Sequence, residues 1–136
     1  MRDATPEAPE TILLVDDDTA VRRMAAKVLR RAGYTVLEAV GGPEALAVAR
    51  SREDHIDLLL TDVVMPVMSG RELSEALVRE RPETKIVFMS GYTDDDVILR
   101  GVSVAEVNFL PKPFTLDGLR RVVRRVLDEQ DPAQPG

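Results

Sequence analysis

Residues able to carry phosphoryl chemistry stand at four separate points of the chain. Three consecutive carboxylates, residues 16–18, follow the apolar run ILLV, and Asp62 follows the run DLLLT. Further along, Ser90 ends the run KIVFMS, and Lys112 lies between two prolines just after VNFL. Carboxylates gathered in one place repel each other and resist ionising together, and a divalent cation resolves that conflict. Magnesium is the natural candidate, since it favours oxygen ligands and commonly joins one or two carboxylates to a phosphate.

Phosphoryl transfer is the reaction that these residue types suit, because a protein mainly positions groups and neutralises charge in it. An aspartate can itself be the nucleophile and form an acyl phosphate. A lysine such as Lys112 would neutralise further negative charge, and a hydroxyl such as that of Ser90 can donate to a phosphoryl oxygen. Taken singly, each residue also has an ordinary explanation as a helix cap, turn or loop residue. The functional interpretation is favoured because all four points follow strand-length apolar runs.

The elements that must position these residues alternate between apolar runs and helical segments. Apolar runs of strand length predict strands at residues 12–15, 35–39, 57–61, 85–90 and 107–110. Apolar residues at helical spacing predict helices at residues 19–32, 43–51, 70–80, 94–100 and 116–127. This alternation predicts a doubly wound α/β fold, with a five-stranded parallel sheet between two layers of helices. Ligands of such sheets bind at the carboxyl ends of the strands, where the candidate residues stand.

The first predicted helix sorts its residues into two groups. Its apolar face comprises Val21, Met24, Ala25, Val28 and Leu29. Its charged residues, expected on the other faces, are Arg22, Arg23, Lys27, Arg30 and Arg31. We expect Asp18 to be the N-cap of this helix.

Length and composition limit the remaining possibilities. The 136 residues, 44% hydrophobic and 31% charged, suit one domain, which we place at residues 11–127 between disordered tails at 1–10 and 128–136. The net charge of −6 makes nucleic acid or an anionic membrane a poor partner. The absence of cysteine excludes disulfides, thiolate zinc sites and cysteine nucleophiles. No apolar run approaches the roughly 18 residues of a membrane span, and we expect a cytoplasmic location.

Four motifs give the chain a resemblance to a known family. The segments ILLVDDD, TDVVMPVMSG, FMSG and FLPKPF stand in the order and at the distances found in receiver domains of two-component response regulators. The resemblance covers residues 10–127. It implies the flavodoxin-like strand order 2-1-3-4-5 and a regulatory phosphoacceptor domain, not an enzyme.

The same resemblance implies a role for each site residue. Asp62 would be the phosphoacceptor, and Asp16 and Asp17 would hold magnesium, one of them mostly through water. Asp62 would also contact the metal, and Val64 would supply its backbone carbonyl as a further ligand.

A second group of residues would sense the phosphoryl group. Ser90 would hydrogen-bond to it, and Lys112 would pair with Asp62 before phosphorylation and with phosphoryl oxygens afterwards. The peptide bond between Lys112 and Pro113 would be cis. Phe109 takes the place of the family's aromatic switch residue and lacks the hydroxyl of the tyrosine often found there.

The implied partners are proteins. A histidine kinase or a histidine phosphotransfer protein would donate the phosphoryl group. A downstream protein would bind the surface formed by the fourth helix, the fifth strand and the fifth helix. The domain would be a monomer or a weak phosphorylation-dependent dimer. Pro111 and the segment GVSVAEV resemble receivers attached to hybrid sensor kinases, so both a free-standing regulator and a piece of a hybrid kinase remain open.

Two alternatives belong to other functional classes. In a haloacid-dehalogenase-like phosphohydrolase, Asp16 would be the nucleophile and Asp18 the acid/base. That family places its acidic metal pair after the lysine, whereas the acids here precede Lys112, and Asp62 would have no role. The second alternative is a receiver fold that binds proteins without ever being phosphorylated.

Overall fold

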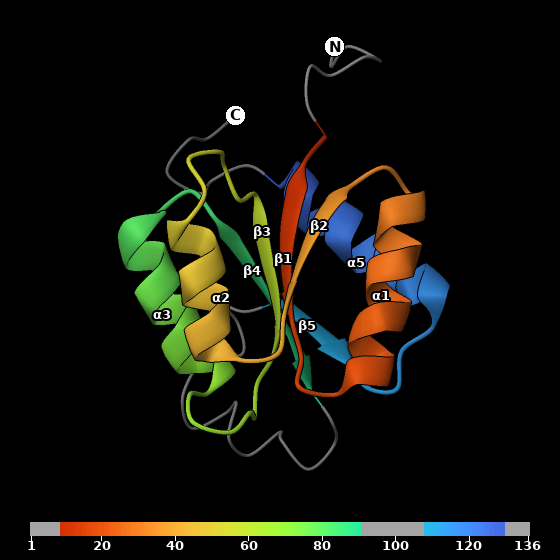
Figure 1. Ribbon diagram of the computed structural model, residues 1–136. Coiled ribbons are helices and arrows are strands. Elements are labelled where there is room, and N and C mark those ends of the chain that lie inside the picture. The colour runs from red at the N-terminus through yellow and green to blue at the C-terminus, as the bar shows by residue number, and fades with distance from the viewer. Residues whose placement is uncertain (1–8, 91–107, 130–136) are drawn as a thin grey trace.

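The computed structural model describes residues 9–90 and 108–129, which form a parallel sheet covered by helices (Figure 1). The strands are β1 Thr11–Val15, β2 Thr35–Ala39, β3 Leu58–Asp62, β4 Lys85–Ser90 and β5 Asn108–Pro111. The described helices are α1 Thr19–Arg31, α2 Gly42–Arg50, α3 Gly70–Glu80 and α5 Leu116–Asp128. The sheet order is β2-β1-β3-β4-β5, and all its pairings are parallel. The predicted doubly wound fold and the order 2-1-3-4-5 are confirmed.

The sheet forms the middle of three layers, because β1 sends alternate side chains into two separate cores. Ile12 and Leu14 pack in the core under α1 and α5, whereas Leu13 and Val15 pack in the core under α2 and α3. These helix pairs lie on opposite faces of the sheet in Figure 1. These four of the five β1 side chains have no solvent exposure. Burial on both faces explains why this strand is a continuous apolar run in the sequence.

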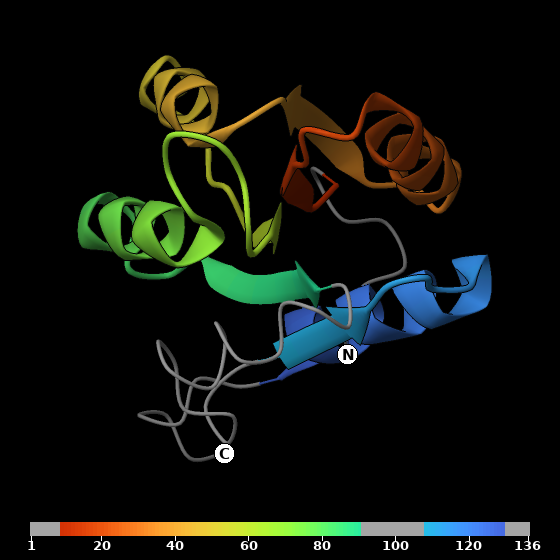
Figure 2. The same cartoon turned by 90° about the horizontal axis from the view of Figure 1, so that it is seen from below.

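The register of the strands brings their carboxyl ends to one edge, which Figure 2 views from below. Val15, the last residue of β1, pairs with Thr61 of β3, and the next residue of β3, Asp62, pairs with Met89 of β4. At the far side of the sheet, Ser90 pairs with Pro111 of β5. The residues that follow β1 and β3 therefore emerge side by side at this edge.

Side-chain caps fix where the helices begin at the same edge. Asp18 is the N-cap of α1, as predicted, and its carboxylate accepts a hydrogen bond from the backbone of Val21 at 3.1 Å. Ser69 and Glu72 form a reciprocal capping box at the start of α3. Such caps satisfy amide groups that the first turn leaves without partners. They make the links from strand to helix short and well defined.

Arg124 of α5 links Glu10, which precedes β1, to Asp128 at the end of α5. Its guanidinium bonds Glu10 at 3.0 Å and Asp128 at 2.8 Å, both of which we placed in disordered tails. It also bonds the Tyr34 hydroxyl at 3.1 Å and lies over that ring. The backbone carbonyl of Glu10 accepts a hydrogen bond from Thr35 at 3.0 Å. Composition alone could not show these contacts between distant segments.

Several sequence predictions fall outside the described residues. They concern the helix at residues 94–100, the first residue of the strand at 107–110, and most of both tails, at 1–8 and 130–136. Among the helices that the structure does describe, none combines the length and the apolar character needed to cross a bilayer.

Gly70, the first residue of α3, allows this helix to approach β3 closely. A Cβ added to Gly70 would lie 2.1 Å from the backbone oxygen of Asp62. The amide of Gly70 donates to the carbonyl of Val63 at 2.8 Å, so the loop from Asp62 closes on itself. Any larger residue must displace the backbone at the end of β3.

Replacing Gly70 with alanine should lower the free energy of unfolding by about 2–3 kcal/mol, because the obstructing atom belongs to the backbone. Gly41→Ala is the matched control, since a Cβ there meets nothing within 4 Å. Gly41 is an N-cap without a side-chain bond, so its replacement should cost less than about 1 kcal/mol. Urea unfolding measures both variants, and equal losses would contradict the close approach.

Candidate functional site

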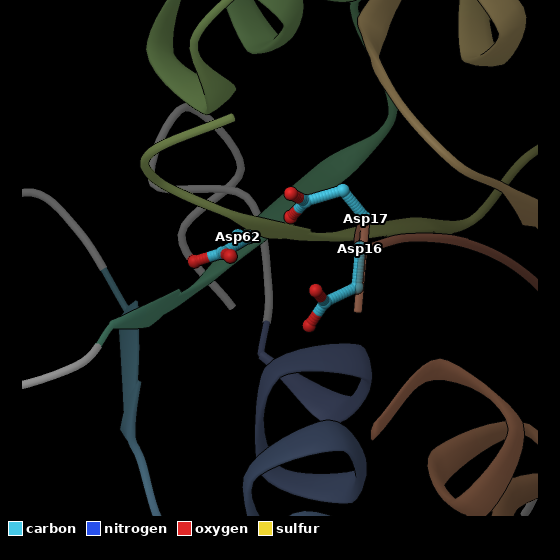
Figure 3. Close-up of side chains that lie close together, drawn as sticks. All are labelled: Asp16, Asp17 and Asp62. Carbon is cyan, nitrogen blue, oxygen red and sulfur yellow. The ribbon is translucent and has the colours of Figure 1, made fainter. Parts of the chain in front are cut away.

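Three carboxylates gather at the carboxyl edge of the sheet. Oxygen atoms of Asp16, Asp17 and Asp62 all lie within 4.8 Å of one another. Figure 3 shows the first two at the end of β1 and the third at the end of β3. The structure therefore brings together the acids that the sequence placed at separate strand ends. Asp16 and Asp62 are buried, whereas Asp17 is exposed.

Asp16 is held at every polar atom and has no solvent exposure. Its carboxylate accepts a hydrogen bond from the backbone of Asp18 at 2.9 Å and another from Lys112 at 3.0 Å. Its amide donates to the carbonyl of Ala39 at 3.2 Å, and its carbonyl accepts from Arg22 at 2.9 Å. With both carboxylate oxygens already bonded, Asp16 is better suited to bind a metal through water than directly.

Asp17 differs from its neighbour in being open to solvent. Its carboxylate makes no hydrogen bond or ion pair within residues 9–90 and 108–129. A carboxylate without protein partners can give its oxygens to a cation without breaking other bonds. Asp17 is therefore the member of the cluster best placed to bind a metal directly.

Asp62 ends β3 and is 7% exposed. One carboxylate oxygen accepts from the backbone of Val63 at 2.9 Å, and the other accepts from Lys112 at 3.3 Å. These contacts orient the carboxylate at the mouth of the cluster.

Lys112 lies between two of the carboxylates and is 22% exposed. Its ammonium group reaches Asp16 at 3.0 Å and Asp62 at 3.3 Å. Burial is the largest influence and lowers the pKa of Lys112, but hydrogen bonds and the charges of Asp16 and Asp62 together raise this pKa above its usual value. The peptide bond to Pro113 is cis, as predicted. Lys112 is thus a permanent cation at neutral pH.

The charges of the cluster do not balance. When all groups are ionised, the three carboxylates and the one ammonium group found among the described residues leave two negative charges, which one divalent cation would neutralise. Oxygen donors of this kind suit magnesium, which takes carboxylates while keeping several waters. The donor set therefore fits the predicted metal. Val64 stands two residues after Asp62, and its role as a carbonyl ligand remains a prediction.

The loop between Asp62 and Gly70 contains a strained turn. Val67 has a φ of 75°, which is unfavourable for a β-branched residue. The amide of Met68 donates to the carbonyl of Pro66 at 2.8 Å across this turn. Met68 also packs tightly over Gly42, where an added Cβ would lie 2.5 Å from its sulfur. The loop that carries Val64 is thereby tied to the start of α2.

The predicted switch residues lie on β4 and β5. Phe109 is half-buried in a small cluster with Val63 and Phe88, next to the end of β3. Ser90 is the last residue of β4, and its side chain is not among the parts of the chain that the structure describes. The side chain of His55 is 82% exposed, and its Nδ1 lies 3.6 Å from a carboxylate oxygen of Glu83.

Sequence analysis misplaced one residue that contacts the site. Arg22 was expected on a solvent-facing side of the first helix, but it is only 8% exposed. Arg22 lies three, four and seven residues before the buried residues Ala25, Ala26 and Leu29, and this helical spacing could have predicted its burial. Met24, expected inside, is instead 39% exposed. The buried face of α1 is therefore rotated relative to our prediction.

Comparison with known families gives one match over most of the chain. A family model described as the response regulator receiver domain matches residues 12–124. This span contains the carboxylate cluster and the whole sheet except Thr11, the first residue of β1.

Two curated relatives from Brucella abortus differ greatly in length. Sensor kinase CckA is 40% identical over 121 residues, which cover 89% of this chain and 13% of CckA. Response regulator receiver protein CpdR is 36% identical over 116 residues, which cover 85% of this chain and 95% of CpdR. The chain thus spans a small part of one relative and almost all of the other.

Solved structures show the same likeness. The chemotaxis response regulator CheY4 of Vibrio cholerae is 33% identical with a TM-score of 0.76, covering 88% of this chain and 99% of that one. The receiver domain from hybrid histidine kinase CckA is 34% identical with a TM-score of 0.67, and the match covers 87% of this chain and 99% of that one.

Proposed function

Because the chain belongs to the response regulator receiver domain family, we propose that it takes a phosphoryl group from a partner phosphohistidine onto Asp62. Receiver domains are regulatory phosphoacceptor domains of two-component systems and not enzymes. The observation that carries the proposal is the position of Asp62 at a strand end, bonded to Lys112 and within 4.8 Å of two further carboxylates.

The proposed step is a substitution at phosphorus. A carboxylate oxygen of Asp62 forms the new bond to phosphorus, and the bond between phosphorus and the partner's imidazole nitrogen breaks. The electron pair of that bond stays on the nitrogen, which then takes a proton from solvent. Lys112 already contacts Asp62 at 3.3 Å, and we propose that its ammonium group bonds the phosphoryl oxygens as they arrive.

Magnesium is the cofactor in this proposal. It would be held by Asp17 directly, by Asp16 mostly through water, by Asp62, and by the carbonyl of Val64. When bound, it neutralises negative charge on the transferring phosphoryl group. The two surplus negative charges of the cluster support this role.

The hydrolase alternative finds no support in the geometry. Its nucleophile would be Asp16, which is fully buried and has both carboxylate oxygens in hydrogen bonds. Its acid/base would be Asp18, whose carboxylate caps α1. Neither residue is available for the part that this alternative assigns to it.

We propose that phosphorylation acts through Ser90 and Phe109 on the surface of the fourth helix, β5 and α5. Reversing a 1:99 equilibrium takes about 5.5 kcal/mol of differential binding, and one hydrogen bond to a charged group supplies roughly 1.5–3 kcal/mol. The Ser90 hydroxyl is therefore insufficient alone. Lys112 and repacking of Phe109, which lies beside Phe88 and Val63, must contribute the rest.

The proposed partners are a histidine kinase or histidine phosphotransfer protein as donor and a downstream protein as reader. We propose a cytoplasmic monomer or weak phosphorylation-dependent dimer, either free-standing or within a hybrid kinase. Nucleic acid is not a proposed partner, because the arginines of α5 are already in ion pairs. These pairs join Arg120 and Arg121 to Asp117, Arg124 to Glu10 and Asp128, and Arg125 to Glu129.

Incubation with acetyl phosphate and magnesium should add one phosphoryl group to the wild-type chain, as measured by intact mass. Asp62→Asn should abolish the addition, because an amide is not a nucleophile here. Asp18→Asn is the matched control and should keep it, since asparagine caps a helix as well as aspartate does. Labelling that survives Asp62→Asn would favour the hydrolase, and an unlabelled wild type would favour the pure binding module.

Asp17→Asn should stabilise the metal-free protein while weakening magnesium binding. Removing one of three crowded carboxylates relieves repulsion on the order of 1 kcal/mol, but it also removes the most accessible metal ligand. Thermal unfolding with and without magnesium measures both effects. The magnesium-induced rise in Tm should nearly vanish in Asp17→Asn and persist in Asp18→Asn. An unchanged rise in Asp17→Asn would reject Asp17 as a ligand.

Ser90→Ala should leave phosphorylation of Asp62 largely intact while weakening the change at Phe109. The reason is that the hydroxyl is proposed to bond the phosphoryl group only after transfer. Beryllofluoride with magnesium serves as the phosphoryl mimic, and the amide shift of Phe109 is the measurement. Ser90→Thr, which keeps a hydroxyl, is the control. Equal shifts in the wild type and Ser90→Ala would remove Ser90 from the switch.

A further inference from the structure

Arg22 is a charged residue buried directly beneath the carboxylate cluster. It is 8% exposed, whereas the other cations of α1 are exposed. Its Nη1 donates to the backbone oxygen of Asp16 at 2.9 Å, and its Nε donates to Glu38 of β2 at 3.2 Å. A guanidinium is costly to bury unless it is paired and hydrogen-bonded. Here both kinds of partner are present.

Two cations therefore hold Asp16 from opposite ends. Lys112 bonds its carboxylate at 3.0 Å, and Arg22 bonds its carbonyl at 2.9 Å. The carbonyl contact has a particular consequence, because that oxygen belongs to the peptide group joining Asp16 to Asp17. A peptide group is planar, so fixing its oxygen also fixes the direction in which the chain continues to Asp17. Asp17 has no side-chain partner among the described residues that could orient it instead.

We propose that Arg22 is a positioning residue for the metal site, and that it aims the Asp17 carboxylate by anchoring the Asp16 carbonyl. Glu38 keeps Arg22 in place and is itself shared with Arg30, which bonds it at 2.9 Å. The chain of contacts thus runs from β2 through the first turn of α1 to the end of β1. This inference rests on the proposed function, because it takes the cluster to be the magnesium site.

The test compares Arg22→Met with Arg23→Met. The two arginines are adjacent on α1, and both variants replace the same side chain and remove the same charge. Arg23, however, is exposed and has no bond to the cluster. Magnesium affinity is measured by amide shifts during titration, and the metal-free shift of the Asp17 amide is recorded for each variant. Urea unfolding gives the stability of each variant separately.

Arg22→Met should weaken magnesium binding about tenfold or more and displace the metal-free amide signal of Asp17. Arg23→Met should change the affinity less than about twofold and leave that signal in place. Arg22→Lys, which keeps a donor, should recover part of the affinity. A loss of stability in Arg22→Met with unchanged affinity and an unmoved Asp17 signal would show a merely structural role and overturn the proposal.

If Arg22→Met does not fold, Glu38→Gln tests the same chain of contacts, because it weakens the hold on Arg22 without removing it. An unmoved Asp17 signal and wild-type affinity in that variant would then overturn the proposal. If the wild type binds no magnesium, the proposed function fails. The metal-free Asp17 signal still decides whether Arg22 positions that residue.

Discussion

Mutual repulsion among three carboxylates, with oxygens within 4.8 Å of one another, is the constraint that the surrounding structure has to withstand. Like charges this close oppose folding, because an unfolded chain would separate them. The parallel sheet overcomes the repulsion by burying β1 and β3 on both faces, so that their ends cannot move apart. Lys112 neutralises one of the three charges, and two remain when only the described residues are counted. Without a bound cation, the domain therefore carries an unfavourable electrostatic energy at the place where magnesium and the phosphoryl group are proposed to bind.

The backbone around the cluster is fixed by two contacts that do not use the carboxylate groups of the cluster. Gly70 lets α3 press against the carbonyl of Asp62, and Arg22 bonds the carbonyl of Asp16. Both contacts act on peptide groups, so they occupy none of the carboxylate oxygens. The division is physically sensible, because a rigid main chain can hold repelling side chains without bonding to all of them. Asp17 can therefore lie close to the other two carboxylates and still be exposed to solvent.

Sequence patterns predicted the strands, the described helices and the meeting of the acids, because those features follow from periodicity and from parallel connections. Lys112 and Asp16, 96 residues apart, could be placed together through the rule that strand ends share an edge. The same patterns misplaced Arg22, since periodicity sorts charged residues outward. Its burial depends on Glu38, which lies in a different element. Likewise the sequence could not predict the positive φ of Val67, because valine normally avoids this backbone conformation.

Arg124 joins Glu10 to Asp128, so the first and last parts of the folded unit leave from a single place. The start of β1 marks the amino-terminal edge of the sheet (Figure 1), and the carboxylates follow the opposite ends of β1 and β3. A domain whose two ends lie close together can be inserted into a longer polypeptide without forcing the segments on either side of it apart. The relatives use it in both ways: this chain matches nearly all of CpdR and 13% of CckA.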